Sequence, residues 1–193
     1  ADLHRQGTWA ASRPVSSSAS RPKRLAGVGR SAQTLGLMYT VSATDRPIEI
    51  TSVPQSSVGA PCPAIVAAEH SLRLVYYLEE DRLSPEWQNV QIKPAAANDS
   101  DGLCAVVAFT HPYAHMFGPP NDEAFTGHPL ASRGLEPYSV YEVAGSSWIK
   151  ALEQMNSVHP YHRAERFKGF KHYIFSFHDS TLECVAESFS IAL

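Results

Sequence analysis

The sequence contains little cysteine and no paired cysteine motif. Its 193 residues include three, Cys62, Cys104 and Cys184, an odd number that is widely spaced and lacks C-x-x-C. This usage gives no sign of a disulfide framework, and a reducing compartment is the simplest assumption. We therefore expect a cytoplasmic protein.

Long apolar runs and nucleotide-binding loops are also absent from the sequence. The longest purely apolar run, Leu103 to Phe109, has seven residues, whereas a helix needs about 20 to span a bilayer. The sequence has no Walker pattern, no G-x-G-x-x-G and no G-x-S-x-G serine elbow. We expect neither a membrane span nor a phosphate loop.

Charge divides the chain into two segments. Residues 1–37 carry six basic side chains and one acid, a net charge of +5, and the remaining ten basic and eighteen acidic side chains give residues 38–193 a net charge of -8. Residues 38–193 are therefore acidic and lack the excess of basic side chains that binds a phosphate backbone, so no nucleic acid partner is expected. Residues 1–37 show no helix or strand period and are predicted to be a disordered or non-native tail, the alternative being a basic arm for a polyanion.

Residues 38–193 predict one globular domain of the α+β class with a mainly antiparallel sheet. Hydrophobic residues make up 44% and charged residues 18% of the chain, as in ordinary globular proteins. Alternating residues predict strands at 72–78, with 64–68 as hairpin partner, and near an edge at 48–53, while 103–109 predicts a central strand covered on both faces. One helix is predicted after the N-cap candidates Ser146 and Ser147, ending near Asn156, and a second from Pro160 to before Gly169.

The C-terminal hairpin allows a more detailed prediction. Segments 171–177 and 182–191 flank the turn 178–181, and an even loop pairs Phe177 with Leu182 and Phe175 with Cys184 on a core face. A three-residue loop would instead bury Glu183 among aromatics. On the outer face, the even register places His172 opposite Glu187 and Ser176 opposite Glu183.

A long loop carries an unusual density of ionisable groups. Twenty-eight residues, 110–137, contain five prolines and three glycines, and loops of this length are often functional. The ionisable groups of the loop are His111, His115, Asp122, Glu123, His128 and Arg133.

Each candidate group in the loop and hairpin has a chemical and a structural interpretation. His111 and His115, four residues apart, suit two metal ligands or ordinary surface histidines, and the glutamate of H-E-x-x-H is absent. Asp122 and Glu123 suit acid/base chemistry or the first turn of a short helix. His178 beside Asp179 suits a general base, a metal ligand or a plain turn.

Two hypotheses of function follow. The first is a small soluble binding or partner-interaction domain for a small molecule or a protein, using loop 111–137 and the outer face of the hairpin. Its binding residues are His128, Arg133, His172, Glu183 and Glu187. The alternative is a metal-assisted hydrolase.

The hydrolase hypothesis has its own residues. Its catalytic candidates are His178, Asp179, Asp122 and Glu123, and its metal ligands are His111, His115 and His178. The sequence assigns no cofactor and allows a divalent metal. Both hypotheses predict that His111 or His115 lies within roughly 10 Å of His178, with Asp122 or Glu123 nearby, because functional polar groups converge in a pocket.

Overall fold

The computed structural model describes residues 40–79 and 103–193, and all of them fall within one compact unit, Gly36–Leu193. The basic segment 1–37 lies outside the described residues. The elements are, in chain order, β1 Arg46–Glu49, β2 Ala64–Ala68, β3 Ser71–Tyr77, β4 Cys104–Thr110, β5 Ala114–Gly118, η1 Phe125–Gly127, η2 Ala131–Arg133, β6 Val140–Ala144, α1 Ser147–Asn156, α2 Ala164–Phe167, β7 Lys171–Ser176, β8 Thr181–Ala186 and β9 Ser188–Ala192.

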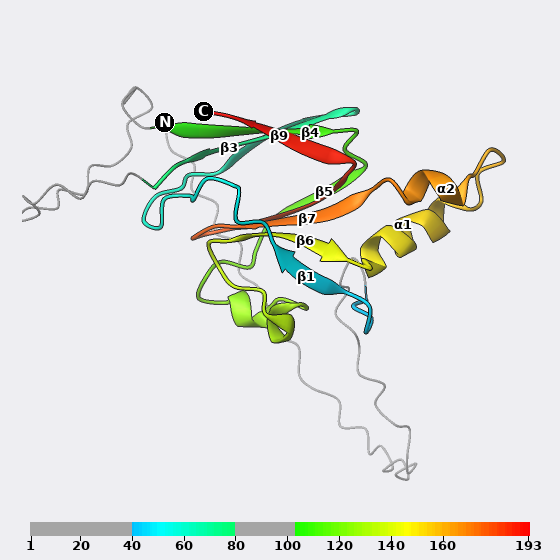
Figure 1. The fold of residues 1–193 in the computed structure, drawn as a ribbon, viewed down its shortest axis with the longest axis horizontal. Helices are drawn as coiled ribbons and strands as arrows, with labels where there is room; N and C mark the ends of the chain where they lie inside the picture. Colours follow the sequence, from blue (N-terminus) through cyan, green and yellow to red (C-terminus); the bar gives the residue numbers. More distant parts are fainter. Residues whose placement is uncertain (1–39, 80–102) are drawn as a thin grey trace, which may run out of the picture. The chain divides into compact units, whose positions relative to one another are not determined.

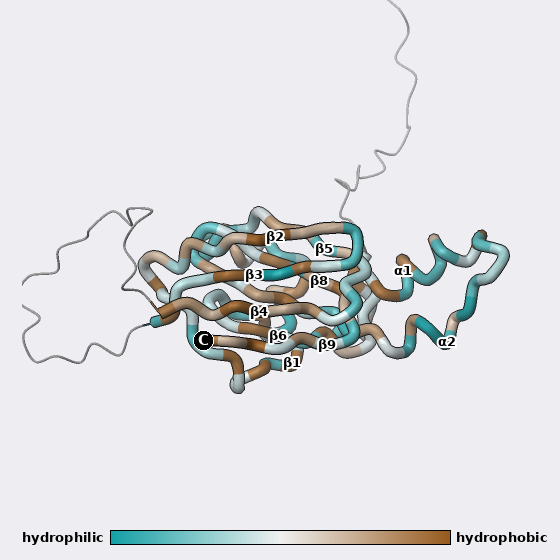
Figure 2. The backbone as a smooth tube through the Cα atoms, turned by 90° about the horizontal axis from the view of Figure 1, so that it is seen from above, coloured by the Kyte–Doolittle hydropathy of each residue, from teal (hydrophilic) through white to brown (hydrophobic). Residues whose placement is uncertain are grey.

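These strands form two antiparallel sheets (Figure 1). One sheet has the order β1-β6-β7-β8-β5 and the other β2-β3-β4-β9, and Figure 2 shows the smaller sheet lying over the larger one. The predicted mainly antiparallel sheet is thus confirmed. The α+β label is not confirmed, because the α-helices are short, with ten residues in α1 and four in α2.

The core between the sheets follows the two-residue period of the strands. Leu72, Leu74 and Tyr76 of β3 point inward, as do Val107 and Phe109 of β4, and they meet inward side chains of β7 and β8. β4 is central to its sheet, as predicted. It is covered on one face only, because its outward positions hold small residues whose partial exposure costs little.

The hairpin of β7 and β8 has the predicted faces but different partners. Phe175 pairs with Leu182 and Ile174 with Glu183, so the register is shifted by two residues from the predicted one. A shift of two keeps every side chain on its face. The shift arises because Phe177 leaves the ladder, its N–H donating to the Ser180 carbonyl at 2.8 Å, which makes a four-residue loop of residues 177–180.

The chain leaves this hairpin earlier than predicted. β8 ends at Ala186, and β9 crosses to the other sheet, where Ile191 pairs with Val107 of β4. Neither predicted pair of the outer face forms, because of the two-residue shift in register: His172 lies opposite Val185 instead of Glu187, and Ser176 lies opposite Thr181 instead of Glu183.

The predicted outer face of the hairpin is a second core. Phe125, Leu130 and Leu135 of the loop pack against Ile174 over one half of this face, and residues of α1 and α2, led by Trp148, pack against Val185 over the other half. His172 is 0% and Glu183 9% exposed. This face of the hairpin is therefore not the solvent-facing recognition surface that the sequence suggested.

The remaining elements agree with the sequence in part. β1 is an edge strand and β2 pairs with β3, as predicted, but β1 covers Arg46–Glu49 and not 48–53. Ser146 caps α1 by accepting from the Ile149 N–H at 3.3 Å, and α1 ends at Asn156. The second helix is only α2, and the loop 110–137 includes β5 and two 3-10 turns. Within the described ranges, we find no helix with the length and apolar character that crossing a membrane requires.

The inner face of the hairpin gives a direct stability test. We expect Phe175→Ala to lower the free energy of unfolding by about 3–5 kcal/mol, because Phe175 is 0% exposed between the sheets. Phe117→Ala is the control at a phenylalanine that is 39% exposed, with an expected loss below about 1 kcal/mol. Urea unfolding checks both values, and equal losses would contradict the assigned packing.

Candidate functional site

The end of the loop and the hairpin turn come together in one polar cluster, formed by Asp122, Tyr138 and His178. His178 Nδ1 lies 3.0 Å from Asp122 Oδ2 and 2.8 Å from the Tyr138 hydroxyl, and the same hydroxyl donates to Asp122 Oδ2. The Asp122 N–H also donates to the His178 carbonyl at 2.9 Å. Backbone and side chains thus fix the loop to the turn at this point.

The hydrogen bonds assign the protons of the cluster. A carboxylate only accepts, and the Tyr138 proton is directed to it, so Nδ1 of His178 carries a proton that it donates. His178 Nε2 is then the acceptor nitrogen, and the side chain is 42% exposed. The nearest carboxylate to Nε2 is that of Asp179, at 4.0 Å. An imidazole held this way presents one basic nitrogen outward.

The cluster also shifts two pKa values. The Tyr138 hydrogen bond is the largest cause that lowers the pKa of Asp122, and the Glu123 N–H and His178 act in the same direction against burial. The bond to Asp122 in turn raises the pKa of Tyr138 to about 12. At neutral pH, Asp122 is therefore an anion and Tyr138 a neutral hydroxyl donor.

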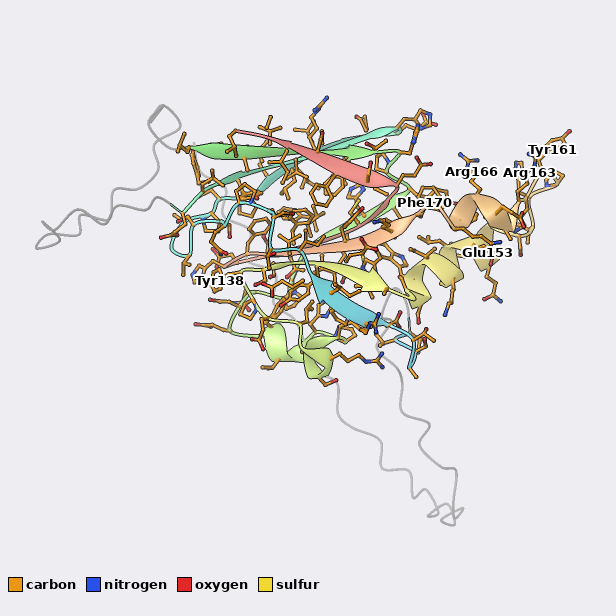
Figure 3. The ribbon with its side chains drawn as sticks, in the orientation of Figure 1. Tyr138, Glu153, Tyr161, Arg163, Arg166 and Phe170 are labelled. Atoms are coloured by element: carbon orange, nitrogen blue, oxygen red, sulfur yellow. The ribbon has the colours of Figure 1, made fainter. Side chains whose placement is uncertain are left out.

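Tyr138 has an unusual backbone. Its φ of 58° lies in the left-handed region, which a bulky residue occupies at a cost of about 1–3 kcal/mol unless its surroundings hold it there. Gln55 Nε2 donates to the Tyr138 carbonyl at 2.9 Å, and the Tyr138 ring stacks on the His178 imidazole at a centroid distance of 6.3 Å. Figure 3 labels Tyr138 at the end of the molecule away from the α-helices.

A cavity of about 240 Å³ lies beside Tyr138, lined from both sheets. Its lining residues are aromatic, aliphatic and polar in similar numbers. The aromatic ones are Tyr76, Tyr138, Phe175 and Phe177, the aliphatic ones Ile50, Val53, Pro54 and Val140, and the polar ones Glu49, Thr51, Gln55, Ser56 and Ser139. Among the residues that the structure describes, no Lys or Arg lines this cavity.

The segment 50–57 closes this cavity by crossing from one sheet to the other. The Ile50 N–H donates to the Val140 carbonyl at 2.7 Å on the larger sheet. On the smaller sheet, the Tyr76 hydroxyl donates to the Pro54 carbonyl at 2.9 Å and the Ser57 N–H to the Tyr77 carbonyl at 2.9 Å. The crossing leaves the aromatic side chains at the end of the inter-sheet core beside the cavity.

A second polar cluster is buried beneath the loop, centred on Glu183. Glu183 Oε1 lies 3.1 Å from His128 Nε2, and Oε2 lies 2.8 Å from His172 Nε2. Nδ1 of His172 lies 3.0 Å from the Ser146 hydroxyl. Four segments of the chain therefore meet at one carboxylate: the loop, the start of α1, β7 and β8.

The tautomer of His128 follows from its neighbours. The Leu130 N–H donates to His128 Nδ1 at 3.1 Å, so the proton of this imidazole is on Nε2 and points at Glu183. Trp148 stands edge-on to His172 at 5.0 Å, and Phe125 stacks on His128 at 5.7 Å. These contacts restrict both rings, and the cluster stabilises the packing of the loop on the sheet.

The remaining candidate residues of the loop make no contact with the cluster of Asp122, Tyr138 and His178 that is described above. Arg133 donates to the carbonyls of Ser42 and Asp45, fixing the segment before β1. Glu123 is exposed. Nδ1 of His111 lies 2.8 Å from an exposed Glu187. His115 is on β5, opposite Cys184.

His111 and His178 lie at opposite ends of β8, so the predicted proximity of this pair is wrong. The backbone of Glu187 is tied to Thr110, next to His111, whereas His178 precedes the start of β8. Six strand residues separate the two ends by about 20 Å. The reason is that β5 runs the length of β8 before the chain reaches Asp122. Asp122 does reach His178, as the same prediction required.

The cysteines and the metal candidates complete the assignment of the predicted residues. None of the three cysteines is in a disulfide, and burial raises the pKa of Cys184 to about 12. Within residues 40–79 and 103–193, no group of three or more His, Cys, Asp or Glu side chains is arranged to hold a metal ion.

Sequence reasoning missed Tyr138 and Glu49. Neither residue is among the candidates of the two hypotheses above. Neither residue carries a local signal of its role, because the cavity exists only where segment 50–57 crosses between the sheets.

The lowered pKa of Asp122 predicts a pH dependence. A carboxyl whose pKa is lower in the folded than in the unfolded state stabilises the fold above its unfolded pKa, and this contribution is lost as pH falls through the folded pKa. Asp122→Asn should therefore be less stable than the parent at pH 7, and the difference should shrink below about pH 4. Thermal unfolding of both proteins from pH 2 to 7 checks this, and a pH-independent difference would refute it.

The shared carboxylate predicts two different costs at position 183. Glu183→Leu leaves two buried imidazole N–H groups without this acceptor, and we expect a loss of about 3–5 kcal/mol. Glu183→Gln should cost less, because the amide oxygen can accept from His128 while His172 moves its proton to Nδ1, toward Ser146. Urea unfolding measures both, and a Leu variant as stable as the Gln variant would contradict the described contacts.

Comparisons with known proteins do not assign this chain to a family. No family model, no curated protein and no solved structure matches it. Function must therefore be argued from the geometry of the residues themselves.

Proposed function

We propose that this chain is a small binding domain whose ligand occupies the cavity beside Tyr138. One observation carries the proposal: a cavity with an aromatic wall adjoins a cluster of oriented polar groups. Binding sites characteristically combine a mostly apolar lining with a few polar groups that fix orientation. The proposed site includes Asp122 of the loop and His178 of the hairpin turn, but it does not include the outer face of the hairpin.

The size of the cavity sets the size of the ligand. About 240 Å³ is the liquid volume of roughly eight water molecules, at about 30 Å³ each. A single ring with a short polar substituent fills such a space. The ring contacts the aromatic wall, and the substituent faces the hydroxyls and Glu49 at the rim.

The charge around the cavity selects a cationic substituent. Glu49 lines the cavity, and Asp122, which accepts from Tyr138, is held as an anion beside it. Aromatic faces attract cations by about 0.5–2 kcal/mol, and a carboxylate adds to this attraction. We therefore assign the site to small organic cations such as aryl amines, with the neutral Tyr138 hydroxyl available to orient them.

We also propose a kind of partner and a cellular compartment. A small molecule fits the cavity better than a protein segment, because the aromatic wall lies inside the sandwich rather than on an exposed face. Three cysteines without a disulfide agree with a reducing compartment such as the cytoplasm. The geometry of the described residues offers no observation that favours a metal-assisted hydrolase.

The ligand class is tested with three probes that share one ring. We expect benzylamine, which is a cation at pH 7, to bind with a Kd of about 1 mM. Benzyl alcohol should bind more weakly and benzoate least. Titration of the ¹⁵N-labelled chain should move the amide signals of Thr51, Tyr138 and Ser139, which line the cavity. The absence of shifts with all three probes would refute the binding site.

Two substitutions provide the matched control for charge. Glu49→Gln should remove most of the preference for benzylamine over benzyl alcohol, because it removes the carboxylate that lines the cavity. Glu187→Gln changes an exposed carboxylate at the other end of β8 and should leave the preference unchanged. Equal effects of the two would mean that the preference reflects net charge alone.

A further inference from the structure

A second hollow lies on the turn that connects α1 and α2. It encloses about 530 Å³ and is lined by Asn156, His159, Tyr161, Arg163 and Arg166. Figure 3 shows Tyr161, Arg163 and Arg166 together at the end of the molecule that carries the α-helices, with Tyr138 at the other end of the picture. Tyr161 is 85% exposed.

The side chains around this hollow present hydrogen-bond donors. His159 Nδ1 accepts from the Tyr161 N–H at 3.1 Å, so its proton is on Nε2 and available to a ligand. The Asn156 amide lies 3.0 Å from Nδ1 of His162 and is engaged with that ring. The Tyr161 hydroxyl and both guanidinium groups add further donors.

Among residues 40–79 and 103–193, no Asp or Glu lines the same hollow. The carboxylate of the nearby Glu153 lies 2.8 Å from His162 Nε2. Among the described residues, neither Arg163 nor Arg166 lies in an ion pair with a carboxylate. An ordinary solvated basic face would not explain why the donors surround one hollow.

We propose that this hollow binds a phosphate monoester group. A phosphoryl group offers several acceptor oxygens and two negative charges, and the planar fork of arginine matches it with paired hydrogen bonds. Two arginines, an imidazole N–H and a phenol supply the complementary donors. This site is independent of the cavity beside Tyr138, since the two share no residue.

The phosphate monoester has two sources, a soluble metabolite or a lipid headgroup. Val158 is 88% and Met155 72% exposed near the same turn, and such side chains contact either the organic part of a soluble ester or the surface of a bilayer. The shared chemistry is the doubly charged phosphoryl group, and the two sources separate by experiment.

The test is a titration of the full ¹⁵N-labelled chain with inorganic phosphate and with phenyl phosphate at constant ionic strength. We expect amide shifts confined to residues 156–167, with a tighter Kd for phenyl phosphate. The double variant Arg163→Gln/Arg166→Gln should lose at least about tenfold in affinity, as expected for removing charged hydrogen bonds. The Arg163→Lys/Arg166→Lys variant should fall between the two, because lysine keeps the charge but not the fork.

Controls separate a specific site from general charge. Arg73→Gln removes an exposed arginine from the smaller sheet and should change the affinity by less than about twofold. Unchanged affinity in the double Gln variant, or equal shifts with sodium chloride alone, overturns the proposal. All variants change exposed side chains, and a parent-like amide spectrum outside the turn confirms their fold.

Vesicles distinguish the source of the phosphate group. Co-sedimentation with phosphatidylcholine vesicles containing phosphatidic acid, lost in the double Gln variant and absent with phosphatidylcholine alone, assigns the site to a lipid headgroup. Binding of phenyl phosphate without co-sedimentation assigns it to a soluble monoester. Absence of both overturns the proposal and leaves the cavity beside Tyr138 unaffected, because that site is measured with different probes and different amide signals.

Discussion

The interaction on which the rest of the structure depends is the Glu183 carboxylate shared by two imidazoles in a hairpin buried on both faces. One face of β7 and β8 fills the space between the sheets, and the other face carries His172 and Glu183 beneath the loop and α1. A buried carboxylate is costly unless its hydrogen bonds are satisfied. His128 and His172 satisfy both oxygens, so the loop can pack only in the position that brings His128 to Glu183.

The position of the loop determines the candidate binding site. With His128 fixed at Glu183, the residues before it reach the hairpin turn, where Asp122 meets His178, and those after it return through Tyr138 into β6. The left-handed backbone of Tyr138 then aims its ring between His178 and the cavity. The buried cluster around Glu183 thus holds in place the accessible cluster of Asp122, Tyr138 and His178.

The core faces of β3 and of the β7–β8 hairpin were predictable from the sequence, whereas β5, the covered outer face of the hairpin, the strand register and part of the site were not. Alternation gave the core faces of β3 and β7 because the side-chain period of a strand is two. It could not give the register, since a shift of two preserves every face. Asp122 was rightly expected near His178, but His111 was not, because β5 intervenes. Tyr138 and Glu49 carried no local signal, since their roles come from segment 50–57 crossing between the sheets.

The central role of Glu183 is tested most directly by the ring nitrogens of its two partners. In ¹H–¹⁵N spectra of the imidazoles at neutral pH, the account predicts a proton on Nε2 of both His128 and His172. Both protons should exchange with water far more slowly than those of His70, whose side chain is 88% exposed. A proton on Nδ1 alone in His128, or exchange in either ring as fast as in His70, would contradict the shared carboxylate.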